Sequence, residues 1–287
     1  MSEAKVILRE AKAAFSSRKM AFPSVKADFS AVFAKIAPDR RLTGSVPTVP
    51  GFPLGGGIAP EPPGCHTGRT ELMATLVCFA LKEEAAPFQK IAAGNSGVST
   101  FIVGIGRQNA EKSLRAWLTT ELPDLVLTCG FAGGLHPDLK LGDVVFELPI
   151  ANPPLTARLL AAGAKPATIH CADRIATTVA EKKQLRYATS ADAVEMESAA
   201  IHAVCAEHAI PCATVRVISD TANEDLPLDF NTLSKPDKSI HFGKLFLAIA
   251  KSPKKIPQLM QLQKKTKFAA QRLADVLEQI TSENLQP

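Results

Sequence analysis

The strongest constraint on the fold comes from residues 192–223, which read DAVEMESAAIHAVCAEHAIPCATVRVISDTAN. Glu195 and Glu197 open an apolar run with helical spacing, and residues 213–218 then form a strand-like run that ends just before Asp220. A carboxylate at the C-terminal end of a strand lies where open α/β sheets bind their ligands. We therefore expect an α/β fold in which a helix start and a strand end bring acidic groups to one site.

Strand-like apolar runs alternate with helical runs along most of the chain. The expected strands cover residues 75–80, 99–103, 124–129, 142–146, 167–171 and 213–218. The expected helices cover residues 110–122, 155–162, 178–187 and 198–209, with a helical tail over 242–280 that Pro253 and Pro257 break. Such alternation is typical of a sheet that helices cover on both faces. The predicted fold is α/β, a three-layer α/β/α arrangement around a central mixed sheet.

The first part of the chain differs in composition from the rest. Residues 1–72 contain eight prolines, and residues 44–68 are rich in both glycine and proline. Such a stretch lacks the periodic apolar pattern that a packed element needs. We expect residues 1–72 to be a disordered extension and linker, either an appended tail or a misassigned start. The catalytic domain is expected to cover residues 73–287.

Composition excludes several classes of protein. The 287 residues are 46% apolar and 21% charged, as in globular proteins. The chain has no apolar run of the roughly 20 residues that a membrane span needs, and its N-terminus lacks the pattern of a secretory signal. Six cysteines without metal-site spacing favour buried, reduced thiols in a cytoplasmic protein. We expect no metal and no other cofactor.

The positive charge is concentrated near the C-terminus. The net charge is +5, and nine lysines lie between positions 235 and 267. A basic patch could bind nucleic acid or an anionic membrane, but it is more often the solvated face of a helix. One Trp and one Tyr provide no aromatic platform on which bases could stack. We expect no nucleic acid partner.

Two glycine-rich turns follow strand-like runs. The first, GIGRQNA, lacks the third glycine of a dinucleotide-binding fingerprint, but its Gly104, Gly106 and Arg107 are candidates for a loop that holds phosphate or water. The second, CGFAGGL at residues 129–135, offers backbone N–H groups that a ligand can approach closely. The alternative for both turns is tight packing of a strand against a helix.

Four separated segments carry a resemblance to a known family. They are FALKEEA (79–85), CGFAGGLHPDLKLGDVVF (129–146), AVEMES (193–198) and RVISDTAN (216–223), in the order that the family has them. Through them the chain resembles the purine and uridine nucleoside phosphorylase superfamily, in particular its 5′-methylthioadenosine/S-adenosylhomocysteine nucleosidase branch. The chain also resembles a related branch, the hopanoid-associated nucleosidase or phosphorylase type. The short loop after Phe146 and the helical tail of this chain carry that resemblance.

The resemblance implies a role for each matching residue. Asp220 matches the acid that protonates the purine at N7, Glu197 the acceptor of the ribose hydroxyls, and Glu84 the base that activates water. Taken singly, these residues could be a turn residue, a helix cap and a complement to a helix dipole. The substrate-binding residues implied by the resemblance are Ala132, Gly133, Ile175, Val194, Glu195, Met196 and Ser219.

The chain departs from the family pattern around the base and the 5′ side of the sugar. Phe131 replaces a small hydroxyl residue, and Ile175 stands where the methylthioadenosine enzymes have an aromatic ring. The long excursion that usually follows the fourth strand is missing. The resemblance implies a purine nucleoside of the adenine type as the substrate. The departures predict weaker stacking of the base and room for a bulky 5′ substituent.

The sequence predicts an N-ribosyl hydrolase that acts as a homodimer on a small nucleoside. Glu84 favours water as the attacking group, and only Arg107 stands near the glycine turns to bind phosphate. Two alternatives stay open at this point. One is a phosphorylase that uses phosphate, and the other is a non-catalytic, nucleoside-binding regulatory module on the same fold.

Overall fold

The computed structural model describes residues 74–233 and 255–282. The expected extension over residues 1–72 and the expected helical tail between 242 and 254 lie outside these ranges, so both stay predictions. None of the helices within the described ranges is long and apolar enough to cross a membrane.

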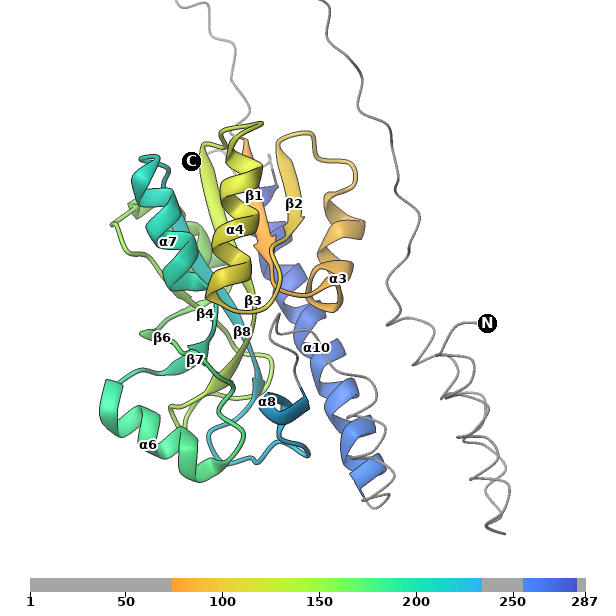
Figure 1. The fold of residues 1–287 in the computed structure, drawn as a ribbon. Helices are drawn as coiled ribbons and strands as arrows, with labels where there is room; N and C mark the ends of the chain where they lie inside the picture. Colours follow the sequence, from red (N-terminus) through yellow and green to blue (C-terminus); the bar gives the residue numbers. More distant parts are fainter. Residues whose placement is uncertain (1–73, 234–254, 283–287) are drawn as a thin grey trace, which may run out of the picture. The chain divides into compact units, whose positions relative to one another are not determined.

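Eight strands form one mixed sheet (Figure 1). They are β1 Thr75–Phe79, β2 Val98–Ile102, β3 Leu125–Gly134, β4 Val144–Glu147, β5 Lys165–Pro166, β6 Ile169–Cys171, β7 Ala193–Glu195 and β8 Cys212–Asp220. The main order is β2-β1-β3-β8-β4-β5, with β7 paired to both β3 and β6. The neighbours β2, β1, β3 and β8 are parallel, whereas β4 runs antiparallel to β8. The carboxyl ends of β1, β3 and β8 therefore meet at one edge.

Helices cover both faces of this sheet. They are α3 Lys82–Ala92, α4 Arg107–Leu118, α5 Pro153–Ala161, α6 Val179–Thr189, α7 Ser198–Glu207, α8 Phe230–Leu233 and α10 Ile256–Thr281. One apolar core joins α3, α5 and α10 to strands β1, β3, β4 and β8. A second core joins α4 and α7 to the sheet from the opposite side, as Figure 1 shows. The expected three-layer α/β/α fold with a mixed sheet is confirmed.

Two predicted boundaries near the glycine turns and the acidic segment were wrong. β3 does not stop at Cys129 but continues to Gly134, because Gly133 and Gly134 pair with the short strand β7. Glu195, which was expected to open the apolar helical run, is the last residue of that strand, whereas α7 begins at Ser198, where the helix over 198–209 was expected to begin. Local pattern could not reveal the pairing of β7, since its partner lies some sixty residues earlier in the chain.

Smaller differences concern helix and strand ends. Helix α4 begins at Arg107, before the expected start at 110. Of the strand expected over 167–171, only β6 at 169–171 forms, and the short strand β5 precedes it. Pro257 does not break α10 but lies in its first turn, where proline needs no backbone N–H and fits the helix.

Candidate active site

The acidic residues predicted from the sequence gather at the carboxyl edge of the sheet. Glu84 lies in the first turn of α3, just after β1, and Asp220 is the last residue of β8. Glu197 lies between β7 and α7, at the N-cap position of that helix. A β-bulge between Ala132 and Gly133 shifts the register of β3 against the end of β8, so that Gly133 pairs with Asp220. Bulges are common beside active sites because they redirect side chains.

Arg216 is the buried cation at the centre of this edge. It lies in β8, is 1% exposed, and its Nη2 bonds to the Glu195 carboxylate and to Thr128 Oγ1 at 3.1 Å. The same Nη2 lies 3.5 Å from Glu197 Oε2. Its buried Nε has no hydrogen-bond partner among the described residues. A cation this deep is stable only when carboxylates surround it.

Gly130 makes room for this cation. A Cβ atom at position 130 would lie 2.7 Å from Nη1 of Arg216 and 2.8 Å from Oε1 of Glu84, and the glycine has a φ of +150°. Only glycine combines that backbone conformation with so little space. The backbone after Cys129 was expected to let a ligand come close. At Gly130 the groups that come close are the side chains of Arg216 and Glu84.

Glu195 is bound by protein groups on all sides. Its carboxylate accepts the N–H groups of Glu197 at 2.9 Å and Ser198 at 2.9 Å, and the Ser198 hydroxyl at 2.6 Å. Burial alone would raise the pKa of Glu195, but Arg216, Ser198 and the backbone N–H groups outweigh burial and lower it. Glu195 was predicted to bind substrate, whereas its bonds here fix the start of α7 and balance Arg216.

Glu197 links the acidic segment to the first glycine turn. Its Oε1 accepts the N–H of Gly106 at 2.8 Å, at the N-terminal end of α4. Gly104 and Gly106 have φ values of +87° and +84°, which glycine adopts without strain. Burial, reinforced by the neighbouring Glu195 carboxylate, raises the pKa of Glu197, against the opposing effect of Arg216.

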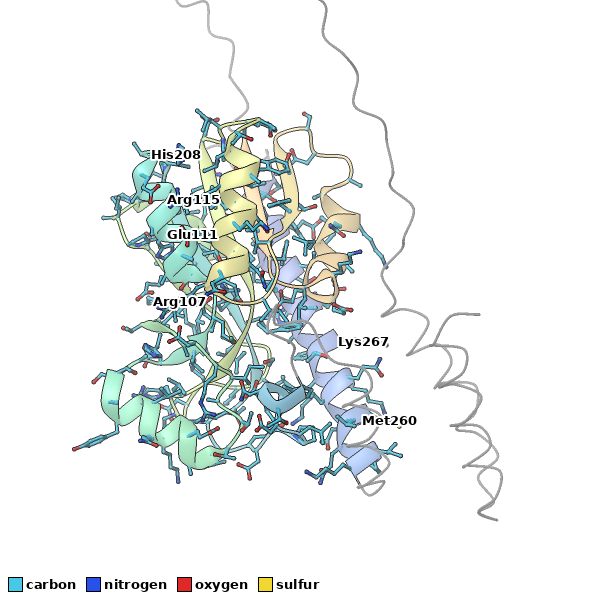
Figure 2. All side chains as sticks on the ribbon, viewed as in Figure 1. Arg107, Glu111, Arg115, His208, Met260 and Lys267 are labelled. Carbon is cyan, nitrogen blue, oxygen red and sulfur yellow. The ribbon has the colours of Figure 1, made fainter. Side chains whose placement is uncertain are left out.

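Arg107, the predicted phosphate or water ligand, is engaged with protein groups. Its Nη2 bonds to the carbonyl oxygen of Cys171, and its Nε lies 3.5 Å from Asp173 Oδ1. Figure 2 labels Arg107 at the N-terminal end of α4. Arg107 is therefore bound to β6 and to the segment that follows it. The N-terminus of α4 is a favourable place for an anion, and the Glu197 carboxylate already bonds there.

Glu84 is held by two backbone groups. Its Oε1 accepts the N–H of Phe131 at 2.9 Å and its Oε2 accepts the N–H of Leu81 at 2.9 Å. Burial raises the pKa of Glu84 from 4.5 to about 7, with a smaller contribution from Glu197, while these N–H groups and Arg216 oppose the rise. A carboxyl group with a pKa near neutrality can accept a proton at physiological pH.

Asp220 has both carboxylate oxygens engaged. Its Oδ2 lies 2.5 Å from Nζ of Lys182, and its Oδ1 accepts the Ser219 hydroxyl at 2.8 Å. Gly133 leaves space for it, since a Cβ there would lie 3.3 Å from Oδ2. The acid predicted from the sequence is therefore fixed in place by two side chains, one of which, Lys182, the sequence did not single out.

The residues predicted to hold base and sugar differ in exposure. Ala132, Val194, Met196 and Ser219 are buried, and Val194 packs with a group of small apolar residues that includes Ala172 and Ala176. Ile175 is partly exposed, and its backbone N–H and carbonyl both bond to the Asn231 side chain of α8 at 2.9 Å.

A surface cavity of about 390 Å³ lies beside the start of β7, because Asp192, the residue just before that strand, borders it. It is bordered by Phe146, Glu147, Leu148, Pro166, Ala167, Thr168 and Asp192. Glu147 pairs with Thr214, six residues before Asp220 along β8, which at the rise of a strand is roughly 20 Å. None of Glu84, Glu197 and Asp220 borders this cavity.

Two charged residues of the site were missed from the sequence. Arg216 could have been found, because a lone arginine inside an apolar strand is almost never buried without carboxylate partners. Lys182 carried no such signal, since the exposed Lys183 beside it looks the same in the sequence. Among the described residues, no group of three or more His, Cys, Asp or Glu side chains is placed to hold a metal ion.

Comparison with known proteins places this geometry in a family. The phosphorylase superfamily model matches residues 74–146 and 147–251. The 5′-methylthioadenosine/S-adenosylhomocysteine nucleosidase of Shewanella sediminis is 29% identical over 161 residues, covering 45% of this chain and 70% of that protein. The nucleosidase of the same description from Staphylococcus aureus strain MRSA252 is 27% identical over 159 residues, covering 44% and 70%.

Solved structures agree on the fold. Futalosine hydrolase of Helicobacter pylori has a TM-score of 0.53 and 19% identity, covering 73% of this chain and 97% of that one. The Neisseria meningitidis 5′-methylthioadenosine/S-adenosylhomocysteine nucleosidase, in complex with methylthio-immucillin-A, has a TM-score of 0.54 and 21% identity, covering 73% and 98%. The family match spans more than half of the sequence, and the fold agrees with it: the chain belongs to the phosphorylase superfamily.

Proposed function

We propose that this protein hydrolyses the N-glycosidic bond of a purine nucleoside of the adenine type. The observation that carries the proposal is the convergence of three carboxyl groups, Glu84, Glu197 and Asp220, in three different environments at one sheet edge. Glu84 has a pKa near 7, Glu197 bonds to the start of α4, and Asp220 is paired with Lys182. A binding module without catalysis would not need a buried base and a fixed acid together.

The proposed reaction assigns one task to each carboxyl group. As the C1′–N9 bond breaks, its electron pair moves to the purine and positive charge develops on the sugar. Asp220, a carboxylate while it pairs with Lys182, takes up a proton from solvent and gives it to N7 of the leaving purine. The Glu197 carboxylate accepts hydrogen bonds from the ribose hydroxyls and stabilises the cationic sugar. Glu84 takes a proton from water as the water oxygen bonds to C1′.

The contacts of the first glycine turn favour water over phosphate. Phosphate would be expected at the N-terminal end of α4, where the Gly106 N–H is already occupied by the Glu197 carboxylate. Arg107 is engaged with the carbonyl oxygen of Cys171 and with Asp173. A phosphate ion there would face a buried carboxylate, which repels it.

We therefore expect base release to be independent of phosphate. A panel of purine nucleosides is incubated with the protein in phosphate-free buffer and with added phosphate, and base and sugar products are quantified. Free ribose, or the free 5′-substituted ribose, should form at the same rate in both buffers. Ribose 1-phosphate as the main product would favour the phosphorylase alternative, and no product from any nucleoside would favour the binding module.

The raised pKa of Glu84 makes a prediction about pH. Because Glu84 must be ionised to accept a proton, kcat/KM should rise with pH up to about 7. Glu84→Gln should lower kcat by roughly 10²–10⁴-fold. The exposed neighbour provides the matched control, since Glu83→Gln should keep both the rate and the pH profile.

The same substitution should alter the pH dependence of stability. The folded pKa of Glu84, about 7, exceeds the value of 4.5 expected in the unfolded chain, so its contribution to stability is complete below about pH 4.5 and is lost as pH rises to about 7. Relative to wild type, Glu84→Gln should therefore be more stable at pH 8 than at pH 5 by about 2.5 kcal/mol, measured by urea unfolding. An equal difference at both pH values contradicts burial as the cause.

We further propose that the nucleoside carries a bulky 5′ group. Only residues 148–152 separate β4 from α5, where the branch that the chain resembles has a longer excursion. Ile175 offers no aromatic face to the base, which forfeits about 1 kcal/mol of stacking. A short loop beside the sugar leaves its 5′ side more open.

This proposal predicts an order of substrates. Purine nucleosides with large apolar 5′ groups, such as an adenosyl lipid, should have higher kcat/KM than 5′-methylthioadenosine. Ile175→Phe is the informative variant, because restoring an aromatic ring should improve KM for 5′-methylthioadenosine. A clear preference of the wild type for 5′-methylthioadenosine over every larger 5′ group would refute the proposal.

We also propose that the protein works in the cytoplasm as a homodimer. Its described cysteines are free thiols, and Cys78, Cys129, Cys171 and Cys205 are buried, which suits a reducing compartment. Ile150 and Leu160 are 72% and 51% exposed, and a second copy of this chain could cover them. Light scattering at micromolar concentration should give the mass of two chains, and the mass of one chain would oppose the dimer.

A further inference from the structure

We propose that Lys182 is a positioning residue for the proton donor Asp220. The inference rests on the proposed function, in which Asp220 protonates the leaving purine. Lys182 lies on α6, outside every segment that suggested the function, and the fold carries its ammonium group to the end of β8.

The surroundings of the ammonium group account for all of its hydrogens. Nζ lies 2.5 Å from Asp220 Oδ2, and it donates to the carbonyl oxygens of Thr221 at 2.7 Å and Glu224 at 2.8 Å. Lysine has three N–H donors, so each of them has one acceptor. The side chain is 0% exposed, and burying a lysine this completely is costly unless a carboxylate faces it. That carboxylate is the predicted acid.

The ion pair fixes the orientation of the Asp220 carboxyl group. Lys182 holds Oδ2 and the Ser219 hydroxyl holds Oδ1, so the group is gripped at both oxygens. Ser219 lies in the stretch where the β-bulge shifts the register between β3 and β8. Rotation of the carboxyl group would break one of these two bonds, and a donor fixed in this way meets the leaving nitrogen in one geometry.

Lys182 also favours the product of the proton transfer. Asp220 takes up a proton from solvent before the reaction. As the C1′–N9 bond breaks, its electrons go to the purine and that proton goes to N7, which restores the Asp220 carboxylate that pairs with Lys182. The ammonium group keeps its own protons throughout and attracts the new negative charge in a site that excludes most water. The expected effect is therefore on the chemical step and specific to leaving groups that need a proton.

A purely structural role is the competing explanation, because Lys182 also bonds the loop after β8. That loop has other attachments, however. The Asp225 side chain accepts the Val179 N–H at 2.6 Å, and the Leu226 N–H bonds to the Thr177 carbonyl at 2.8 Å. Glu224 Oε1 lies 2.5 Å from Nζ of Lys265 on α10. The loop is thus tied to α6 and α10 without Lys182.

The test compares two leaving groups in the full-length protein. One substrate is the best purine nucleoside of the panel, and the other is 4-nitrophenyl β-D-ribofuranoside, whose phenolate leaves without a proton. Lys182→Met should lower kcat for the purine nucleoside by about 10²-fold or more, with KM changed by less than about threefold. Its kcat for the nitrophenyl riboside should stay within about threefold of wild type. The control Lys183→Met, at the exposed neighbouring position, should leave both substrates unchanged.

A second comparison removes both partners. In an Asp220→Asn background, adding Lys182→Met should cause no further loss on the purine nucleoside, because the residue acts through Asp220. This double variant buries no unpaired charge, so it provides the test even where Lys182→Met alone does not fold. A further loss in the double variant would overturn the inference.

Two other results would overturn it as well. If Lys182→Met lowers kcat equally for both substrates, Lys182 has a structural role. If Lys182→Met keeps the wild-type kcat for both substrates, as Lys183→Met should, Lys182 has no role in the reaction. Failure of the wild type to release base from any nucleoside is a different result, since it removes the proposed function itself and, with it, the basis for this inference.

Discussion

The structure depends on one buried guanidinium group. Arg216 lies in the middle of β8 and is in contact with Glu195, Glu197 and Thr128. Such a charge is stable in the interior only because carboxylates oppose it: burial acts to lower the pKa of Arg216, but the neighbouring carboxylates outweigh it and raise the pKa. Gly130 leaves the space that the guanidinium needs.

The site is organised around this charge balance. Glu195 pairs with Arg216 and bonds to the first N–H groups of α7. Glu197 bonds to the first glycine turn, and Glu84 is buried with a pKa near 7. Lys182 plays the corresponding part at the end of β8, where it opposes Asp220. Two cations thus divide the acidic residues into two groups, which allows neighbouring carboxyl groups to differ in protonation at one pH.

The sequence predicts the layers of the fold well and its long-range pairings poorly. Alternating apolar runs and helical periodicity identify the central strands, because those signals are local. Strand β7 has three residues, and it forms because Gly133 and Gly134 lie beside it in space. The same difference applies to the site. Segments with a family resemblance contain the three carboxyl groups, whereas the partner of Asp220 lies on a helix whose sequence gives no sign of it.

The ion pair between Arg216 and Glu195 is the interaction on which the site depends most. Urea unfolding of Arg216→Met, Glu195→Met and the double variant measures the coupling between the two side chains. Each single substitution leaves a buried charge without its partner and should cost about 3–5 kcal/mol of unfolding free energy. The double variant should lose less unfolding free energy than the two single variants together, by about 2 kcal/mol or more. Losses that add to within about 0.5 kcal/mol would contradict it, because the guanidinium and the carboxylate would then stabilise the site independently.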